Sequence, residues 1–292
     1  MSRLRALLVL LVAAALLTGC TGGSPSGSSS TRSPGGSTTA STSPSSASSP
    51  SSSAAAPSIA LPAPPPPDAC YWLTPPQLTQ ATNGSAPVSC RGPHTARTIF
   101  VGRLDTVVDG HAVAVDSARV QRQLATTCPR RLAAYVGGSP ATRALSRFNV
   151  VWYSPSLDQS DRGADWFRCD LIAFGRGQLL AELPAATLRG VLQRPAALAD
   201  YGLCGTAAPG APGFERVICG RPHSWRALST VPLAGGRSYP GVATVRRAGD
   251  ADCRARARAQ ASDSLKFSYG WEWPTGDQWR AGQHYGYCWV PA

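Results

Sequence analysis

Lysine is nearly absent from this chain of 292 residues: Lys266 is its only lysine, and arginine supplies the rest of its 28 basic residues. Acidic residues number 16, so the formal net charge is +12. This arginine bias, beside abundant alanine, glycine and proline, is typical of a GC-rich genome and is no sign of a selected chemistry. The excess of positive charge predicts attraction to anionic lipid head groups, wall polymers or acidic proteins.

Motifs of common enzymes are missing as well. The sequence has no G-x-S-x-G nucleophile elbow, no H-E-x-x-H zinc pair and no phosphate-binding glycine loop. Asp263 lies three residues before Lys266, where an S-x-x-K nucleophile motif requires serine. Acid pairs such as Asp158 with Asp161 lie in polar stretches, which usually leave carboxylates solvated. We therefore predict that the protein is not an enzyme and has no catalytic residue, metal or cofactor.

The sequence also lacks an apolar run long enough for a spanning helix, which needs about 20 residues. The run Ala6–Leu17 follows two arginines and precedes "LTGC", which ends at Cys20. This order is typical of an export signal, and "LTGC" matches the bacterial lipobox, in which the cysteine carries the lipid. The alternative is an ordinary secretory signal that happens to contain a cysteine. We expect a lipoprotein signal peptide over residues 1–19 and a lipidated Cys20.

Residues 20–67 consist almost entirely of Ser, Thr, Gly, Pro and Ala, with Arg32 as their only charged residue. Such a segment cannot bury enough apolar surface to offset the entropy lost on ordering. We therefore expect a disordered tether that holds a folded part away from the membrane. The remaining residues suffice for one large or two small domains.

Cysteine, in contrast, is frequent in the rest of the chain. Eight cysteines follow Cys20, an even number that predicts four disulfides in an exported protein. They form two sets of four with matching neighbours: the second cysteine begins a C-x-x-P-H pentapeptide, the third lies in an arginine-rich stretch, and the fourth follows a tryptophan. The sets are Cys70, Cys90, Cys128 and Cys169, then Cys204, Cys219, Cys253 and Cys288.

The repeated order of cysteines predicts two copies of one unit, residues 68–174 and 201–292, with a connector over residues 175–200. Each copy has a strand pattern after the Pro-His turn, a helical segment around its third cysteine, and two further strand patterns. The predicted fold class is α+β: two tandem, small modules of strand–helix–strand–strand order, each stapled by disulfides.

Helix ends and cysteine pairs follow from the same patterns. In the first module Asp116 is the expected N-cap, with Pro129 interrupting the helix, and in the second the helical pattern covers residues 241–260. Each set of cysteines allows three pairings, and we favour the first with the second and the third with the fourth. These pairs are Cys70–Cys90, Cys128–Cys169, Cys204–Cys219 and Cys253–Cys288.

The connector contains four apolar residues at Leu183, Leu188, Val191 and Leu192. In a stretch that joins two small modules, such residues favour burial over exposure. We expect them to pack one module against the other.

The two pentapeptides, "CRGPH" and "CGRPH", each place a proline in a turn and a histidine at the start of the next strand. Pro93 and Pro222 fix φ in the turn. For His94 and His223 three roles are open: a hydrogen bond that fixes the turn, which is favoured, contact with a ligand, or acid–base catalysis.

Aromatic residues gather before the fourth cysteine of each set, and they include Trp166 and Trp279. In a small module stapled by disulfides, such residues favour a core position. The alternative is a surface that stacks on a ligand or binds a protein, since Trp, Tyr and Arg dominate interface energies.

Taken with the cysteines, these motifs resemble the septum-formation domain of actinobacterial lipoproteins and membrane proteins. That domain combines V-x-C-x-x-P-H with a cysteine inside a helix and a late W-x-x-G…C. The matching residues include Val88–His94, Cys128, Val217–His223, Trp279 and Cys288. The resemblance covers the whole expected folded part and implies two tandem copies of the domain in an envelope lipoprotein associated with septum formation. The family usually has an acidic residue three positions after the histidine, where this chain has Arg97 and Arg226.

We therefore expect a lipid-anchored, extracytoplasmic binding or scaffold protein of the bacterial cell envelope, associated with septum formation or cell division. It would lie on the outer face of the cytoplasmic membrane, facing the cell wall. Its expected partners are the membrane, through the lipid anchor, and anionic wall polymers or division proteins of the envelope, and no nucleic acid. The alternative is a cell-wall-acting enzyme or accessory factor with a site between the two modules.

Overall fold

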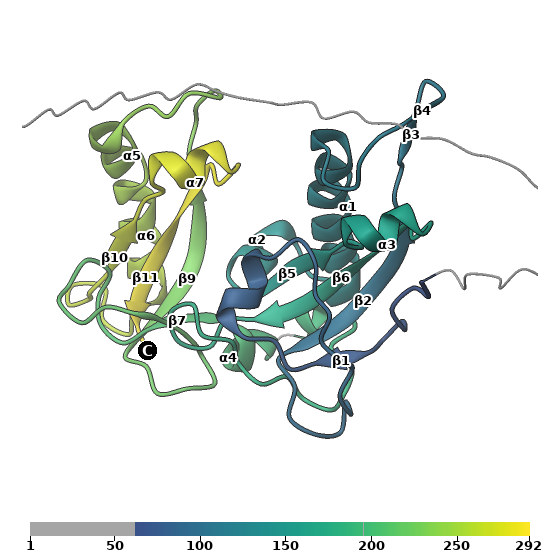
Figure 1. The fold of residues 1–292 in the computed structure, drawn as a ribbon. Helices are drawn as coiled ribbons and strands as arrows, with labels where there is room; N and C mark the ends of the chain where they lie inside the picture. The colour runs from purple at the N-terminus through teal and green to yellow at the C-terminus, as the bar shows by residue number, and fades with distance from the viewer. Residues whose placement is uncertain (1–61, 195) are drawn as a thin grey trace, which may run out of the picture. The chain divides into compact units, whose positions relative to one another are not determined.

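The structure is a computed structural model that describes residues 62–194 and 196–292. These residues belong to one compact unit that holds two larger antiparallel sheets and one two-stranded sheet (Figure 1). The expected signal peptide, Cys20 and the expected tether up to residue 61 lie outside the described residues. Within the described part, no helix combines the length and the apolar character that crossing a membrane requires.

The first module contains a four-stranded sheet in which every neighbouring pair is antiparallel. Strand β6 lies inside this sheet and is buried along its whole length, because its inner face meets a helix and its outer face meets the chain around β1. In spatial order the strands are β1 (Cys70–Tyr71), β2 (Ala96–Arg103), β6 (Trp166–Ala173) and β5 (Phe148–Tyr153).

Helix α1 (Ala118–Val136) covers one face of this sheet and contacts β2, β5 and β6 (Figure 1). Its N-cap is Ser117, not the expected Asp116, because the Ser117 hydroxyl accepts a hydrogen bond from the Val120 amide. The helix also continues through Pro129, where an interruption was expected. Buried residues on both sides of the proline, with Cys128 joined to β6, keep the two halves on one sheet and outweigh the lost hydrogen bond.

Shorter elements complete the first module. A two-residue turn, Asp109-Gly110, joins a small hairpin, and both turn residues have positive φ, as a tight hairpin turn requires. The elements are η1 (Pro75–Thr79), β3 (Val107–Val108), β4 (His111–Ala112), α2 (Pro140–Ala144) and α3 (Leu157–Asp161).

The second module contains a five-stranded antiparallel sheet covered by α6 (Asp250–Gln260), which contacts β9, β10 and β11. Two shorter helices, α5 (Val242–Ala248) and α7 (Gly276–Arg280), lie in the loops between strands. In spatial order the strands are β10 (Gly270–Glu272), β11 (Tyr285–Pro291), β9 (Trp225–Pro232), β7 (Leu203–Gly205) and β8 (Arg216–Ile218).

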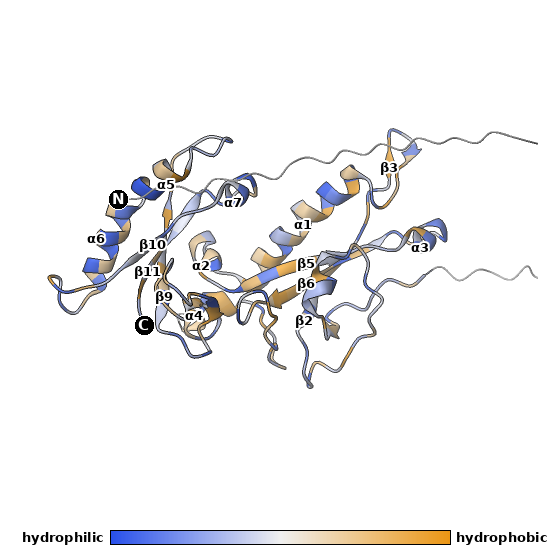
Figure 2. Ribbon diagram, turned by 60° about the vertical axis from the view of Figure 1, so that its left-hand side comes forward, coloured by the Kyte–Doolittle hydropathy of each residue, from blue (hydrophilic) through white to orange (hydrophobic). Residues whose placement is uncertain are grey.

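The helical segment expected over residues 241–260 is divided in two at Gly249. A Cβ atom at Gly249 would lie 2.1 Å from the Trp271 side chain, so the chain breaks its helix where this indole packs against the backbone. Helix α6 itself buries only Cys253 and Ala257, which explains why it is rich in hydrophilic residues while β5 and β6 are largely hydrophobic (Figure 2).

Both modules have the same arrangement of strands around their disulfides. The order β1-β2-β6-β5 in the first corresponds to β7-β9-β11-β10 in the second, and the valine before each pentapeptide pairs with the first cysteine of its set. The expected α+β fold, with two modules stapled by disulfides, is therefore present. The disulfides are Cys70–Cys90, Cys128–Cys169, Cys204–Cys219 and Cys253–Cys288, the pairs favoured from the sequence.

The connector lies between the modules as a shared core, as its apolar pattern predicted. Leu183, Leu188, Val191 and Leu192 are all buried, in a cluster that also holds Leu171 of the first module and Ile218 of the second. This stretch includes η2 (Val191–Gln193) and α4 (Ala197–Tyr201).

Backbone hydrogen bonds fix the same junction. The Leu203 amide donates to the Leu145 carbonyl at 2.8 Å, and the Arg147 amide donates to the Tyr201 carbonyl at 2.8 Å. The Ile218 amide likewise donates to the Gly175 carbonyl at 2.7 Å. The ends of the two sheets are therefore connected by the backbone itself, which positions the side chains that face the junction.

Candidate functional site

The histidines of the two pentapeptides hold their own turns. His94 Nδ1 lies 2.9 Å from the Gly92 carbonyl oxygen, and His223 Nδ1 lies 2.7 Å from the Arg221 carbonyl oxygen. Because a carbonyl only accepts hydrogen bonds, each ring carries its hydrogen on Nδ1. This is the turn-fixing role that was favoured from the sequence, and the exposed Pro93 and Pro222 lie in the two turns.

The two histidines differ in access. His94 is completely buried, and no hydrogen-bond partner of its Nε2 lies among the described residues. It therefore offers nothing to a ligand. His223 is partly exposed and lines a cavity of about 400 Å³ with the Cys204–Cys219 disulfide and Arg226. A ligand contact remains open for His223 alone.

The two tryptophans singled out from the sequence also differ. Trp279 is 1% exposed, donates its indole N–H to the Gly236 carbonyl at 3.0 Å and stacks on His284. It is a core residue, so the alternative of a ligand surface is wrong for Trp279. Trp166 is also buried, but it lines a cavity of about 390 Å³ together with Pro62–Pro64 and Arg103.

The arginines at the family's acidic position have different surroundings. Arg97 donates to the carbonyl oxygens of Ala185 and Ala186, so it holds the connector against β2. Arg226 is exposed and lines two neighbouring cavities. Neither arginine can replace a carboxylate as the partner of a general acid–base histidine.

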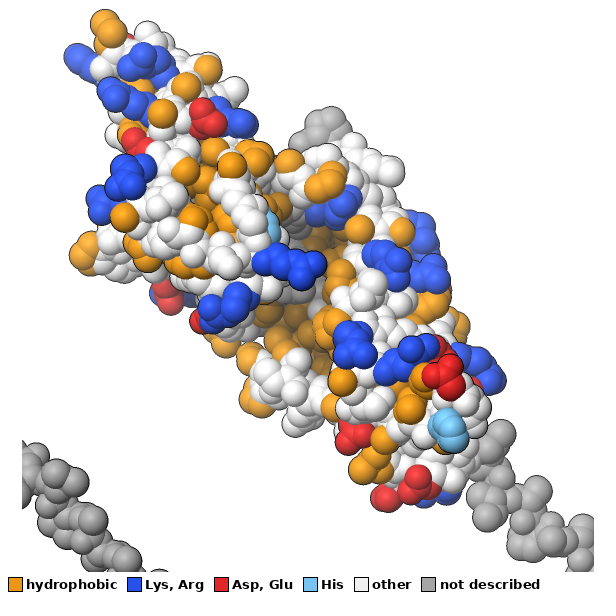
Figure 3. Space-filling view, turned by 90° about the horizontal axis from the view of Figure 1, so that it is seen from above, with side chains coloured by type: hydrophobic (Ala, Val, Ile, Leu, Met, Phe, Trp, Pro, Cys, Tyr) orange, Lys and Arg blue, Asp and Glu red, His pale blue; other side chains and the backbone are white. Residues whose placement is uncertain are grey.

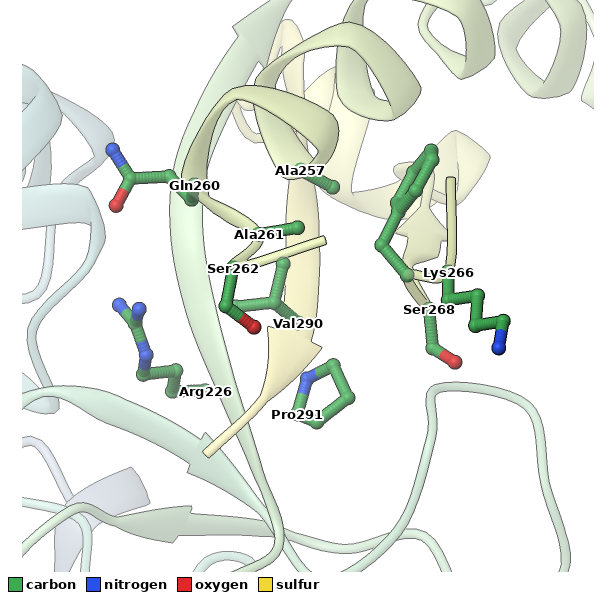
Figure 4. Close-up of a pocket in the computed structure, with 10 residues that line it drawn as sticks. Arg226, Ala257, Gln260, Ala261, Ser262, Lys266, Ser268, Val290 and Pro291 are labelled. Atoms are coloured by element: carbon green, nitrogen blue, oxygen red, sulfur yellow. The ribbon is translucent and has the colours of Figure 1, made fainter. Parts of the chain in front are cut away.

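The α6 cavity has a volume of about 590 Å³ and lies where α6, the loop after it and the end of β11 meet (Figure 4). Ala257 and Val290 give it apolar walls, while Arg226 and Lys266 lie on opposite sides. No carboxylate and no histidine belongs to its described lining. This combination suits an anion that carries an apolar group.

The arginine cavity, of about 420 Å³, lies between the two modules. Three guanidinium groups contribute to it, from Arg143 in α2, Arg147 just before β5, and Arg216 in β8. The other lining residues are mainly polar or aromatic: Ala144, Ser146, Phe148, Asn149, Phe174, Gln178, Tyr285 and Tyr287.

Arg147 is the most enclosed of the three arginines, with 8% of its surface exposed. Its Nε donates to the Phe174 carbonyl at 3.0 Å and its Nη2 to the Gly177 carbonyl at 2.6 Å. Burial, followed by the nearby charge of Arg216, lowers its pKa to about 10, so it stays charged near neutral pH. No carboxylate of the described chain lies within ion-pair distance of this guanidinium.

Arg216 and Arg143 are held by different partners. Arg216 Nη2 lies 2.8 Å from a carboxylate oxygen of Glu272, and its guanidinium lies over the Tyr287 ring, 5.2 Å from the centroid. Arg143 donates to the carbonyl oxygens of Gly137 and Gly138. Burial raises the pKa of Tyr287 far above its usual range, so this phenol remains a neutral hydrogen-bond donor.

A second buried cluster of charges lies inside the first module. Arg168 and Asp170 are 2% and 0% exposed, and their Nε and Oδ2 atoms are 2.9 Å apart. The Thr98 hydroxyl donates to Asp170, and the Arg168 guanidinium lies 3.8 Å from the Tyr71 ring centroid. Burial raises the pKa of Asp170 to about 6, against the lowering effect of Arg168. Because both side chains are buried and neither lines any of the cavities described here, we assign them a structural role.

Metal binding finds no support in the part of the chain that the structure describes, which holds no group of three or more His, Cys, Asp or Glu side chains close enough for an ion. All eight cysteines that follow Cys20 are joined in disulfides, which removes the thiolates that bind metals best.

Comparison with known families agrees with the motifs. The sequence model described as "Septum formation" matches residues 141–288, just over half of the chain. The chain belongs to the septum-formation family. The family match extends from α2 to Cys288 in β11 and therefore includes all three arginines of the arginine cavity. No curated protein and no solved structure matches the chain.

The septum-formation match is single and crosses the boundary between the modules. The resemblance implied one copy of the domain in each module, whereas the family model is matched once, from the second half of the first module through most of the second. The region shared with the family therefore contains the junction, the connector and the second pentapeptide, which begins at Cys219.

The three cavity arginines were missed in the sequence because nothing marks them among so many others. Arg216 lies far along the chain from Arg143 and Arg147, and the junction between the modules brings it to them. Basic side chains are also widespread over the surface, as the face in Figure 3 shows, so arginine content alone carries no signal.

Proposed function

We propose that this member of the septum-formation family is a lipid-anchored, extracytoplasmic binding or scaffold protein of the bacterial cell envelope that acts in septum formation. The family match carries this proposal. The lipobox at Cys20 supports anchoring on the outer face of the cytoplasmic membrane, toward the wall. Four disulfides support an oxidising compartment outside the cytoplasm.

Duplication of one ancestral unit explains the repeated architecture. Its support is the equal order of strands in the two sheets, the equal disulfide pairing and the repeated pentapeptide. On this proposal the two modules have since diverged, and the family domain now spans their junction.

Binding is favoured over catalysis by the chemistry of the two cavities. The lining of the arginine cavity and of the α6 cavity includes guanidinium, ammonium, hydroxyl and amide groups, without a carboxylate or histidine. Cleavage of a glycosidic bond usually requires two carboxylates at a fixed separation. Groups that donate hydrogen bonds and carry positive charge suit the binding of anionic wall polymers, envelope division proteins or other anionic partners instead.

The alternative function is a cell-wall-acting enzyme or accessory factor. The position of the arginine cavity between the modules favours this candidate, because clefts between domains commonly hold active sites. Incubation of the purified protein with isolated wall discriminates between the two. Release of soluble wall fragments would support the enzyme, while wall that is bound and unchanged would support the binding protein.

The decisive experiment is live imaging of a C-terminal fluorescent fusion beside a label for newly made wall. We expect the wild-type fusion to be enriched at the division septum. A uniform signal along the membrane would contradict the role in septum formation.

The matched control for this experiment is Cys20→Ala, which removes the proposed acceptor of the lipid. We expect this fusion to lose its membrane association and to appear in the soluble extracytoplasmic fraction, because no other anchor is proposed. Retention of Cys20→Ala at the membrane would contradict lipid anchoring without bearing on the septal role.

A further inference from the structure

The arginine cavity carries positive charge that the described residues do not balance. Three guanidinium groups line it, and the nearby carboxylate is Glu272, paired with Arg216. Three positive charges and one negative charge leave a net charge of two. Arg147 is buried without a carboxylate partner, and burial of an unbalanced charge is costly, so the cavity favours a ligand that supplies the missing negative charge.

The geometry of the donors restricts the ligand further. Arg147 and Asn149 belong to the first module, and Arg216 and Tyr285 belong to the second. Guanidinium groups form paired hydrogen bonds with phosphate and carboxylate oxygens. A tetrahedral phosphate has oxygens that face several directions at once, which fits donors on opposite sides better than a planar carboxylate does.

We propose that the arginine cavity binds a phosphate group in its dianionic form, carried as a monoester on an envelope molecule. The two negative charges of this group match the net charge of the cavity. Asn149 and Tyr285 supply neutral hydrogen bonds to the remaining oxygens. The proposal deepens the proposed binding function by naming its ligand, and it depends on that function only for the source of the ligand.

Binding at this position would also connect the modules. A phosphate held by Arg147 and Arg216 contacts both sides of the junction, beside the backbone bonds already present there. A ligand that binds the folded state alone raises the free energy of unfolding, so phosphate is expected to raise the melting temperature as well.

The test is a calorimetric titration of the full-length chain in detergent with four probes: inorganic phosphate, methyl phosphate, dimethyl phosphate and acetate. We expect inorganic and methyl phosphate to bind with similar affinity, and dimethyl phosphate and acetate at least tenfold more weakly, because each carries a single negative charge. Failure of methyl phosphate to bind at about 10 mM would overturn the proposal. If acetate binds as tightly as methyl phosphate, the proposed preference for a dianion is wrong. If inorganic phosphate binds and methyl phosphate does not, the proposal that the ligand is a monoester is wrong.

Substitutions test whether methyl phosphate binds in the arginine cavity. Arg216→Gln removes one guanidinium of the cavity, and we expect it to weaken methyl phosphate at least tenfold. Arg254→Gln, on the exposed surface of α6, changes the net charge equally and is the matched control, expected to bind as the wild type does. Equal weakening in both variants would show attraction to overall charge and would overturn the site.

Arg147→Met provides a second test, since it keeps most of the side-chain volume while removing the guanidinium. Its folding is checked by circular dichroism and by the four disulfides before titration. A folded Arg147→Met variant with wild-type affinity would exclude Arg147 from the site. If methyl phosphate fails to bind while the wild-type fusion still marks the septum, the phosphate site is wrong and the proposed function stands.

Discussion

Arg168 and Asp170 flank the fourth cysteine of the first module, and both are enclosed by its core. The same positions around Cys288 in the second module hold Tyr287 and Trp289, which are also buried. One arrangement of strands therefore accepts either an ion pair or two aromatic side chains there. Since a buried ion pair often contributes little net stability, the first module does not depend on its charges for folding.

The pH dependence of stability follows from Asp170. Its pKa is raised in the folded state to about 6, above the ordinary 3.8, so the folded chain binds this proton more tightly than the unfolded chain does. The stabilising contribution is complete below about pH 4 and is lost as the pH rises to about 6, with no further change from this group above that value. Urea unfolding between pH 4 and pH 7 measures the effect.

The control for this measurement replaces the whole pair, Arg168→Met with Asp170→Leu, so that neither charge is left buried alone. We expect the double variant to fold and to lose the decline in stability between pH 4 and pH 6. A decline of equal size in the double variant would assign the pH dependence to another group.

At the scale of helices and strands, the break between α5 and α6 is caused by the packing of the Trp271 indole against the backbone. The Trp271 ring lies against Gly249 and also against Gly286 in β11, where a Cβ atom would approach it to 2.2 Å. Its N–H donates to the carbonyl of Val245, within α5, at 3.3 Å. Two glycines and one tryptophan therefore position the helices on the second sheet.

Gly249→Ala is expected to destabilise the protein by about 1–3 kcal/mol, since the added methyl group must displace the Trp271 ring or the backbone. Thermal or urea unfolding measures the loss. Gly84→Ala is the matched control, because a Cβ atom at Gly84 meets nothing within 4 Å, and it is expected to be neutral or slightly stabilising. A loss of similar size in both variants would refute the role of the ring.

The disulfides of each module differ in access. Cys90 and Cys219 are partly exposed, whereas both members of Cys128–Cys169 and of Cys253–Cys288 are completely buried. Because reduction needs a thiolate to reach a sulfur atom, we expect mild reductant to open Cys70–Cys90 and Cys204–Cys219 first. Alkylation of the native protein followed by peptide mapping measures the order. Earlier labelling of Cys128 or Cys253 would contradict it.

The features that could be predicted from the sequence are those that contain cysteines or a clear hydrophobic pattern. The four pairs, the two α+β modules and the buried connector follow from residues whose chemistry allows few alternatives. The continuous α1 and the divided α5 and α6 could not be predicted, because tertiary packing decides both. Pro129 is tolerated by a helix held on its sheet, and Gly249 is selected by a distant tryptophan.

At the scale of the whole molecule, the candidate site could not be predicted from the sequence. Its three arginines meet at the junction, and the motifs left ligand contact as the alternative role for His94 and Trp279, which are both buried in the structure. Local motifs predict local geometry well, whereas a cavity between two modules depends on how distant segments are joined.

The last strand of the chain, β11, lies inside the second sheet between β10 and β9, and Ile218 completes the core shared with the first module. Because the chain is synthesised from its N-terminus, the first module is made before the residues of the second module that complete the shared core. Until Ile218 and its strand are in place, apolar surface around Leu171 and the connector stays exposed and prone to aggregation. A chain truncated before β11 would lose Tyr287 and Trp289 from the cluster that they form with Leu145, so the damage would reach the first module as well.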